Sequence, residues 1–384
     1  MKIIYVTTSL EENDYVEFNK HWKVSLNPSN QNFHNKMIRA LSIDNEIDVI
    51  SIRPFSKTNC NLFHLKAEEK TVGNITYHYL KIKRTRLFRV WAIKKQVKAL
   101  LEKEDLSNTI VIADTINPKC VNVANHIKKL FHCQVVGICT DSPSNITGTT
   151  RSYTMYLLHQ CQKMDGFITL TEGLNLLYNP SDKKHLTIEG VVESESYQNN
   201  IPVEGKYIFF GGALLPRYGV YNLIEAFKLV SQEDISLIIC GHHANEEQIN
   251  ASIDGDNRIK YLGILPVKEV LAFEQHSIAN INPRPFTQDL DRLSIPSKTL
   301  EYLASGCLTI SVKNTELEKN FKNLAIWAKS GSVNDLYSAI ESALKMSDEE
   351  RKNLANKAKN VAISNYSIEK VGESITDFLS LFLQ

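Results

Sequence analysis

The sequence lacks the features that define several common protein classes. Its seven cysteines are an odd number without a Cys-x-x-Cys pair, so they predict neither a disulfide framework nor a zinc site. No run of about 18 apolar residues occurs, and the apolar start from Lys2 to Thr8 is too short for a signal peptide or a membrane span. We therefore expect a cytoplasmic protein in a reducing compartment.

Repeats, low-complexity tracts and a strong net charge are absent too. The 384 residues are 43% hydrophobic and 23% charged, which is ordinary for a globular protein, and the length favours two domains. The net charge is +1, but residues 1–195 contain 25 Lys and Arg against 20 Asp and Glu, and the remainder contains 19 against 23. This mild asymmetry favours an anionic partner for the first half and does not indicate nucleic acid.

Short β-branched runs alternate with helical patterns, as is typical of α/β domains with parallel sheets. The first set of expected strands covers 2–7, 47–53, 75–80, 109–114, 134–139, 166–170 and 185–189. The second set covers 206–211, 235–240, 259–263, 278–282 and 308–312. The polar stretch 193–205 predicts a linker between them. We expect two doubly wound domains, at 1–195 and 204–365, with a C-terminal helix at about 366–384 that packs back on the first.

The first half offers few candidate site residues. The polar segment Ser9–Asn30 predicts a loop at the edge of a cleft, and His34, just after it, is predicted to lie at the surface. Asp114 and Asp141 each come at the end of an expected strand, where ligands of such sheets bind. Asp114 is a candidate for acceptor binding. Asp141 is a candidate site residue, or else an ordinary turn residue before Pro143.

Residues 81–98 form a basic segment without any acidic residue. Its cations are Lys81, Lys83, Arg84, Arg86, Arg89, Lys94, Lys95 and Lys98. Apolar residues, Val90 and Trp91 among them, are interleaved with the charges, which suits an anionic membrane surface or a lipid-linked diphosphate. The alternative is a solvated basic helix with Val90 and Trp91 in the core.

The stretch Pro296–Gly306 predicts a short helix on which a site can be built. Ser297 is a good N-cap, because its hydroxyl can accept an amide proton, and Gly306 suits a left-handed helix end. Helical spacing separates three apolar residues from three polar ones: Leu300, Leu303 and Ala304 against Ser297, Lys298 and Glu301.

The polar face of this helix lies at a helix N-terminus. Free amides and the helix dipole favour an anion there, and Lys298 adds a full positive charge, so a phosphate or diphosphate is the predicted ligand. Glu301 would be repulsive unless it served another group, and the diol of a ribose is the obvious partner. The helix therefore predicts a clamp for a nucleotide diphosphate.

Glycines after the first strand of the second half predict a further contribution to this clamp. Gly211 and Gly212 allow a backbone to approach a phosphate closely, and Arg217 follows in the same loop. The adjacent His242 and His243 are not expected to bind a metal, because loop neighbours seldom ligate one ion and no carboxylate cluster completes a site.

The region Ile281–Ile310 resembles the donor site of retaining glycosyltransferases with the GT-B fold. It is similar to the family-4-like group that includes bacterial capsule and O-antigen transferases, and the order of elements fits from about Lys206 onward. The resemblance implies two facing Rossmann-like domains and a nucleotide-sugar donor, expected to be a UDP-sugar. It also implies a hydroxyl acceptor in surface-polysaccharide assembly, such as a polyprenyl-diphosphate-linked glycan at the inner face of the membrane, and no metal or other cofactor.

The resemblance also assigns residues. Asp141, Arg217 and Lys298 take the catalytic positions. The donor-binding positions are Gly211, Gly212, Arg284, Arg292, Ser297, Thr299 and Glu301. The charge pattern of 81–98, rather than the resemblance, assigns Arg84, Arg86 and Arg89 to the acceptor and membrane side, and Asp114 is assigned there by its place at a strand end.

Three departures from the family pattern stand out. Gly212 and Tyr218 occupy positions where the family has basic residues, so Arg284, Arg292 and Lys298 are expected to supply that charge. Leu293 occupies the position of an earlier glutamate, for which Asp289, Asp291 and Arg292 are the candidate substitutes. A glycine pair early in the chain is missing. Two alternatives follow: a UDP-sugar isomerase of the same fold, and a noncatalytic partner subunit, which Gly212 and Leu293 favour.

Overall fold

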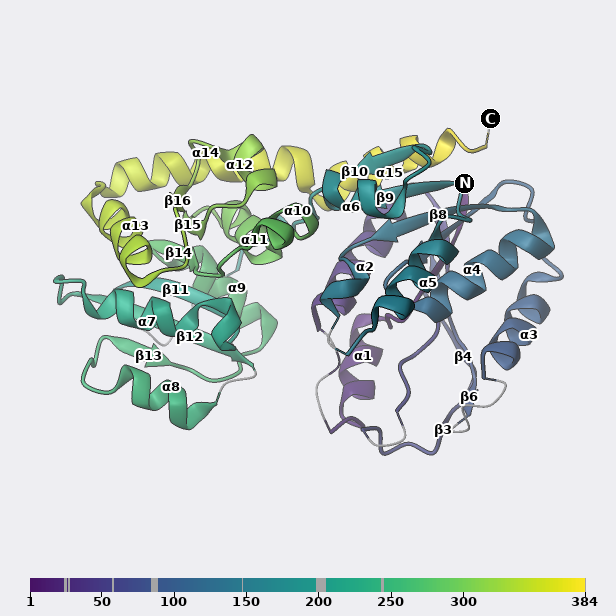
Figure 1. The fold of residues 1–384 in the computed structure, drawn as a ribbon, viewed down its shortest axis with the longest axis horizontal. Helices are drawn as coiled ribbons and strands as arrows, with labels where there is room; N and C mark the ends of the chain where they lie inside the picture. The colour runs from purple at the N-terminus through teal and green to yellow at the C-terminus, as the bar shows by residue number, and fades with distance from the viewer. Residues whose placement is uncertain are drawn as a thin grey trace. The chain divides into compact units, whose positions relative to one another are not determined.

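The structure is a computed structural model that describes residues 1–383 apart from 24, 25, 27, 57, 58, 84–88, 147, 198–204, 243 and 244; at 288 and 289 only the backbone is described. It divides into two compact units (Figure 1). Unit 1 comprises Met1–Val191 and Ile368–Gln384, and unit 2 comprises Val192–Ser367. The C-terminal segment thus belongs to unit 1. Much of the predicted linker, 193–205, lies outside the described residues.

Unit 1 is built on an eight-stranded sheet with the order β10-β9-β8-β7-β1-β2-β5-β4. Its strands are β1 (Lys2–Thr7), β2 (Glu46–Ser51), β4 (Glu68–Val72), β5 (Ile75–Tyr79), β7 (Thr109–Asp114), β8 (Gln134–Cys139), β9 (Gly166–Thr169) and β10 (His185–Thr187). Neighbours pair in parallel except β4 with β5. A separate antiparallel pair joins β3 (His64–Leu65) to β6 (Ile82–Lys83). Each strand that the sequence predicted for this half is present.

Helices connect these strands. They are α1 (Glu12–Asn19), α2 (Pro28–Leu41), α3 (Arg89–Leu101), α4 (Pro118–Phe131), α5 (Arg151–Cys161), α6 (Glu172–Tyr178) and α15 (Ile368–Ser380). The last of these, yellow in Figure 1, packs on α2, where a Cβ at Gly372 would come within 2.2 Å of the Ala40 oxygen. The two helix backbones are therefore in close contact, and glycine permits it.

Helix α1 corrects the prediction of a loop over Ser9–Asn30. The Glu11 carboxylate caps the helix by accepting hydrogen bonds from the amides of Asn13 and Asp14. Only Phe18 is buried in it, so the segment has no apolar periodicity from which a helix could be predicted.

Unit 2 contains a six-stranded sheet with the order β13-β12-β11-β14-β15-β16, and every pair is parallel. Its strands are β11 (Lys206–Ala213), β12 (Ile235–His242), β13 (Ile259–Tyr261), β14 (Ala279–Asn282), β15 (Leu308–Val312) and β16 (Ile326–Ala328). In chain order the strands lie 3-2-1-4-5-6, the arrangement of dinucleotide-binding folds. The predicted strands are confirmed, whereas β16 was not predicted.

The helices of unit 2 surround this sheet. They are α7 (Val220–Lys228), α8 (Glu246–Ile253), α9 (Val267–His276), α10 (Gln288–Leu293), α11 (Ser297–Ser305), α12 (Thr315–Phe321), α13 (Val333–Lys345) and α14 (Asp348–Tyr366). Fully buried Phe227, Leu237, Ile281, Ile310 and Ile340 belong to the main core, which joins strands to α7 and α13. A second cluster around Phe209 and Phe273 fills the space under α9. The sheet is thereby covered on both faces, which leaves its carboxyl edge for a site.

Candidate active site

The candidate site lies in unit 2 where the strand order reverses. Strands β11 and β14 are neighbours, although β12 follows β11 in the chain on its other side. Ligands of doubly wound sheets bind beyond the carboxyl ends of the strands at such a point. Gly211 and Gly212 lie near the end of β11, and Pro283 and Arg284 follow β14. These loops and the start of α11 form the candidate site.

Two glycines let the loops of this edge approach one another. Gly241 has a φ of +147°, and a Cβ there would lie 1.7 Å from the Gly212 oxygen. Gly219 has a φ of +81° at the start of α7, and a Cβ there would lie 2.3 Å from the Pro283 oxygen. A side chain at either position would push apart backbone segments that contribute to the candidate site.

Helix α11 begins and ends close to the predicted residues. Gly306 ends it in the left-handed conformation with a φ of +88°, as predicted. The prediction that Ser297 is the N-cap is wrong: Pro296 holds that position, and Ser297 is the exposed first residue of the helix. Pro296 has no side-chain group that could cap the helix, so the first amides of α11 receive no capping bond from it.

The predicted division of α11 into two faces is confirmed. Leu300, Leu303 and Ala304 are buried, whereas Ser297 is exposed and Lys298 and Glu301 are partly exposed. Thr299 lies on the interior side and is fully buried.

Thr299 connects α11 to the sheet. Its hydroxyl accepts a hydrogen bond from the Asn282 amide at 2.8 Å and shares another with the Ser311 hydroxyl at 2.9 Å. These bonds link the helix to β14 and β15, so Thr299 orients α11 from within rather than pointing toward a ligand.

Lys298 lies between two carboxylates. Its ammonium is 2.8 Å from Glu301 Oε2 on the same helix and 2.9 Å from Glu274 Oε1 on α9. The Glu274 side chain is only 2% exposed, compared with 26% for Glu301 and 33% for Lys298. Glu274, Glu301 and Lys298 thus form one charged cluster near the start of α11.

The electrostatic balance of this cluster keeps Lys298 charged. Burial alone would lower the pKa of the Lys298 ammonium, but Glu274 and Glu301 together outweigh it, and the pKa lies well above its ordinary value. Lys298 is therefore a cation throughout the neutral pH range.

Sequence reasoning missed Glu274, although a signal was present. Glu274 follows Val270 by four positions, which places both on one face of α9. Val270 packs on the cluster around Phe273, so the glutamate is directed to the interior. A charged residue on the apolar face of a helix indicates a buried ionic partner.

Tyr302 connects the cluster to the glycines of β11. Its buried hydroxyl accepts a hydrogen bond from the Gly211 amide at 3.0 Å, and its ring lies 6.0 Å from the Lys298 ammonium. Burial raises the pKa of the Tyr302 phenol above its ordinary value, so the group stays neutral. The tyrosine thereby holds the end of β11 beside α11.

Two arginines gather around Tyr218. The guanidinium carbons of Arg217 and Arg284 lie 5.2 and 5.3 Å from the centre of its ring. This distance is typical of cation–π contacts. Tyr218, which stands where the family has a cation, thus brings two cations from separate loops to one place beside the strand ends.

The residues just before α11 in the chain have different structural roles. Arg292 is exposed in the last turn of α10, and Leu293 ends that helix. Asp291 accepts hydrogen bonds from the Thr315 amide at 2.8 Å and the Asn314 side chain at 3.0 Å. Asp291 therefore fixes the start of α12, and the side chain of Asp289 lies outside the described part of the chain.

In unit 1, Asp114 and His34 lie in the interior. Both are at most 1% exposed, their closest atoms are 3.6 Å apart, and His34 Nδ1 shares a 2.7 Å hydrogen bond with the Tyr5 hydroxyl. The prediction that His34 lies at the surface is wrong, since α2 turns it toward the buried ends of β1 and β7. Asp114, a candidate for acceptor binding, is enclosed in this cluster.

Asp141 makes the bonds of a turn residue. Its Oδ1 accepts from the Ser142 amide and the Asn145 side chain, both at 2.7 Å, and its backbone oxygen accepts from Tyr178. These bonds fit the alternative of a turn before Pro143, and a contact with a sugar stays a prediction.

The basic segment is described only in part, and Arg84 and Arg86 lie outside the described residues. Arg89 begins α3, donates to the Lys83 oxygen at 3.1 Å and lies 5.5 Å from the Phe55 ring. Ile93, Val97 and Leu101 form the buried face of α3. Val90 and Trp91 are 41% and 63% exposed, so the alternative that placed them in the core is wrong.

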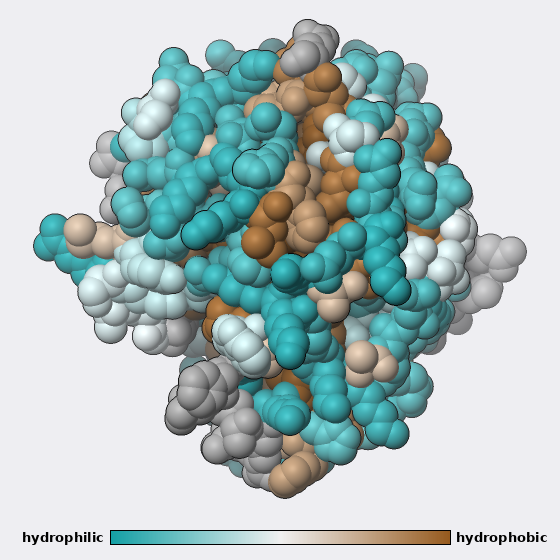
Figure 2. Space-filling model, turned by 90° about the vertical axis from the view of Figure 1, so that its right-hand side faces the viewer, coloured by the Kyte–Doolittle hydropathy of each residue, from teal (hydrophilic) through white to brown (hydrophobic). Residues whose placement is uncertain are grey.

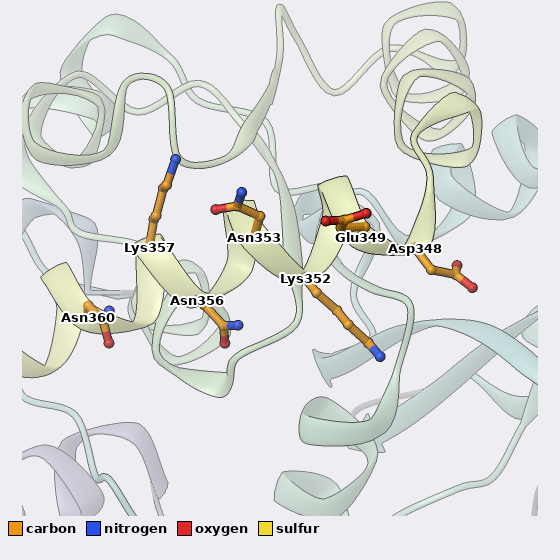
Figure 3. Close-up of a pocket in the computed structure, with 7 residues that line it drawn as sticks. All are labelled: Asp348, Glu349, Lys352, Asn353, Asn356, Lys357 and Asn360. Carbon is orange, nitrogen blue, oxygen red and sulfur yellow. The ribbon is translucent and has the colours of Figure 1, made fainter.

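A shallow depression along α14 does not resemble a catalytic site (Figure 3). Its lining residues all belong to one helix: Asp348, Glu349, Lys352, Asn353, Asn356, Lys357 and Asn360. Figure 3 shows these side chains spreading away from the helix in different directions rather than converging.

Neither a cluster of metal ligands nor a membrane-spanning helix is present among the described residues. In this part of the chain, no three His, Cys, Asp or Glu side chains gather as the ligands of a metal ion would. None of the described helices combines the length and the apolar character needed to cross a membrane.

Solved structures with this fold match the whole chain. Sucrose-phosphate synthase from Thermosynechococcus elongatus has a TM-score of 0.69 at 12% identity, with 99% of both chains covered. A glycosyltransferase from Rickettsia africae reaches 0.70 at 13% identity, covering 100% of this chain and 98% of its own. The E. coli trehalose-6-phosphate protein bound with UDP-2-fluoro glucose reaches 0.68 at 14% identity, covering 100% and 99%. The protein has the GT-B fold of these structures.

The family comparison is specific to unit 2. Residues 191–361 match the family model of glycosyl transferases group 1. No curated protein matches the chain. Most of unit 2 is therefore similar to a glycosyl transferases group 1 domain, and the protein is an enzyme of the glycosyltransferase class.

Proposed function

We propose that the protein transfers a sugar from a UDP-sugar to a hydroxyl acceptor with retention of configuration at the sugar. One observation carries the proposal: at the switch point of the region that matches glycosyl transferases group 1, the Tyr302 hydroxyl of α11 accepts a bond from the Gly211 amide near the end of β11, and Lys298 lies 6.0 Å from the Tyr302 ring. The E. coli structure that shares the fold was solved with UDP-2-fluoro glucose, which supports a uridine nucleotide.

The proposed chemistry depends on stabilising a departing diphosphate. The amides at the start of α11 and Lys298 are placed to bind its charge, and Arg217 and Arg284 add two further cations nearby. Glu301 binds the ribose diol. As the family resemblance implies, the departing phosphate oxygen accepts the proton of the acceptor hydroxyl, so no separate base is assigned.

We further propose that turnover requires no divalent metal, because Lys298, Arg217, Arg284 and the helix amides supply positive charge where a metal would otherwise do so. Transfer activity should therefore persist in excess EDTA. A loss of activity on chelation that Mn²⁺ or Mg²⁺ restores would contradict this.

For the acceptor we propose a lipid-linked glycan of a bacterial surface polysaccharide, in keeping with a family-4-like transferase. The support comes from unit 1, where the basic segment leads into α3 with Val90 and Trp91 exposed. Figure 2 views the molecule from the side on which α3 and α4 lie in Figure 1, and it shows a band of hydrophobic side chains within a mostly hydrophilic surface.

The test has two stages. Thermal shift with nucleotide diphosphates identifies the base, since a ligand at 100 times its dissociation constant stabilises a protein by about 2.7 kcal/mol. The corresponding nucleotide sugars are then incubated with and without a polyprenyl-diphosphate-linked acceptor. Transfer that depends on the acceptor is the expected result. Conversion of the nucleotide sugar without an acceptor would instead favour the isomerase, and stabilisation by none of the nucleotides would contradict the proposal.

A further inference from the structure

Glu274 is a buried carboxylate to which the proposed donor chemistry gives no part. It lies on α9, outside the loops at the strand ends, yet its Oε1 is 2.9 Å from the Lys298 ammonium. Lys298 is bonded at the same time to Glu301, at 2.8 Å. One cation is thus shared between a carboxylate that is 2% exposed and another that is 26% exposed.

The surroundings hold Glu274 in place. Its backbone oxygen accepts a hydrogen bond from the Asn280 side chain at 2.8 Å, and the same amide donates to the Ser305 hydroxyl at 3.1 Å. Asn280 is fully buried on β14, and Ser305 is the last residue of α11. This network joins α9, β14 and α11, so Glu274 cannot follow a ligand outward, whereas Glu301 lies on the accessible face of α11.

We propose that Glu274 is a positioning residue: it retains the Lys298 ammonium at the start of α11 while Glu301 leaves Lys298 for the ribose of the donor. This inference rests on the proposed function, because it requires that Glu301 binds a ribose. A ribose diol that donates hydrogen bonds to both oxygens of Glu301 displaces Lys298 from that carboxylate. With Glu274 in place, Lys298 keeps one carboxylate when the other departs.

Removing the charge of Glu274 therefore has a specific consequence. In Glu274→Gln, Glu301 becomes the only carboxylate of this cluster that holds Lys298, so their ion pair is stronger and the ribose competes for Glu301 less well. The positive charge of Lys298 is, in contrast, less neutralised in this variant, which favours binding of the diphosphate. Ligands with a ribose should bind more weakly, and ligands that are diphosphate alone should not.

The experiment measures the binding of UDP and of inorganic pyrophosphate to the full chain by calorimetry. For Glu274→Gln we expect UDP to bind about 3 to 10 times more weakly, the equivalent of one hydrogen bond, and pyrophosphate to bind at least as tightly as to the wild type. The matched control is Glu225→Gln on α7, which makes the same change in an ion pair with Lys228 whose glutamate is 53% exposed. It should leave both affinities unchanged.

Other outcomes overturn the inference in distinguishable ways. Tighter binding of both ligands would mean that Glu274 only neutralises Lys298, and weaker binding of both would mean that the substitution damages the site. The inference also requires that the effect of Glu274 on UDP binding depends on Lys298. On a Lys298→Met background, Glu274→Gln should leave the UDP affinity unchanged, because the proposed effect of Glu274 is exerted on Lys298.

The inference and the proposed function fail separately. If the wild type binds UDP and Glu274→Gln binds it equally well, the role of Glu274 is wrong and the UDP site stands. If the wild type binds no UDP at all, both are overturned.

Discussion

Glu301 provides the most direct test of the donor site at the scale of single residues. Its carboxylate is partly exposed on α11 and is proposed to bind the ribose. Removing a hydrogen bond to a charged group costs about 1.5 to 3 kcal/mol, which is roughly 10 to 150 times in affinity. Calorimetry should therefore show this loss for UDP in Glu301→Ala.

A matched control exists on α8, where Glu247 is an exposed helix residue distant in sequence from the site. Glu247→Ala should bind UDP as the wild type does. Wild-type UDP affinity in a folded Glu301→Ala variant would show that the ribose contact is assigned to the wrong residue.

Lys298 makes a separate prediction about stability. Lys298→Met removes the ammonium next to the buried carboxylate of Glu274, and breaking a buried ion pair costs about 3 to 5 kcal/mol. Because a third of the Lys298 side chain is exposed, we expect a smaller loss of about 2 kcal/mol in the free energy of unfolding, measured with urea.

The pH dependence of this loss follows from the pKa of Lys298. The pKa is raised in the folded state, so the stabilisation is complete below the ordinary pKa of lysine and is lost only as the pH rises through the folded value. The difference between Lys298→Met and the wild type should thus not decrease as the pH rises from about 7 to 9. A difference that disappears as the pH rises through this range would contradict a charged Lys298.

The sequence could predict those site residues whose role depends on local geometry. Helical spacing alone separated Leu300 and Leu303 from Lys298 and Glu301, and the structure confirms it. The same spacing places Glu274 on the apolar face of α9, but it could not identify the partner, Lys298, which lies 24 positions away on another helix. Ser297 fits the composition of an N-cap, yet the fixed φ of the preceding Pro296 lets the helix begin one residue earlier than expected.

At the scale of secondary-structure elements, the turn at Gly219 decides whether the loops of the site meet. Gly219→Ala would strain the left-handed backbone and press a Cβ against the Pro283 oxygen, at 2.3 Å. The clash should separate the loop of Arg217 from that of Arg284. We expect weaker binding of UDP and a loss of stability greater than the roughly 1 kcal/mol that a strained backbone alone costs.

Gly255 offers the matched control for this substitution. It has nearly the same φ, +85°, but nothing lies within 4 Å of a Cβ built there. Gly255→Ala should therefore show the backbone cost alone, with unchanged UDP affinity. Equal stabilities of the two variants, measured by urea unfolding, would show that the approach of Gly219 to Pro283 does not matter.

Helices and strands with a clear pattern of buried apolar residues were predictable from the sequence, and those without such a pattern were not. The buried run that forms β7 or β15 is bounded by polar residues, and the sequence predicted both strands at their observed bounds. Helix α1 has one buried residue, and strand β4 has none, so neither has a periodic apolar face. Such elements form because the rest of the unit is already in place, through contacts such as those of Lys70 on β4 with Glu11 and Asp14.

At the scale of the whole molecule, the two units share one plan but differ in charge. Each has a sheet that extends from its first strand to one side through the second strand, and to the other side through the last strands in the chain. The alternation of strands and helices predicted this plan, since right-handed crossovers leave few other arrangements. The distribution of charge is not fixed by the fold, because exposed residues vary without affecting the core. The positive excess in the first half therefore carries information about partners.

We predict that this positive excess brings the enzyme to an anionic membrane through residues 81–98. The segment has eight basic residues and no acid, and Trp91 at the start of α3 is 63% exposed. Each Lys or Arg near an anionic surface contributes about 1 kcal/mol, and the attraction fades beyond a Debye length of about 10 Å at 0.1 M salt. If three or four of them face the lipid, the attraction is a few kcal/mol, enough for reversible binding. Cosedimentation with anionic vesicles should detect this binding, and high salt should abolish it.

The control must distinguish an effect of the basic segment 81–98 from an effect of the net charge of the protein. Changing Arg84, Arg86 and Arg89 to Glu should abolish vesicle binding, and Trp91→Ala should weaken it. Changing Lys345, Lys352 and Lys357 to Glu alters the net charge equally on exposed positions of unit 2 and should leave binding intact. Equal losses in the two triple variants would mean that overall charge, rather than the segment, attracts the protein. Equal recovery of the wild type with neutral and anionic vesicles would exclude an electrostatic attraction altogether, because uncharged headgroups provide no surface potential for the cations to bind.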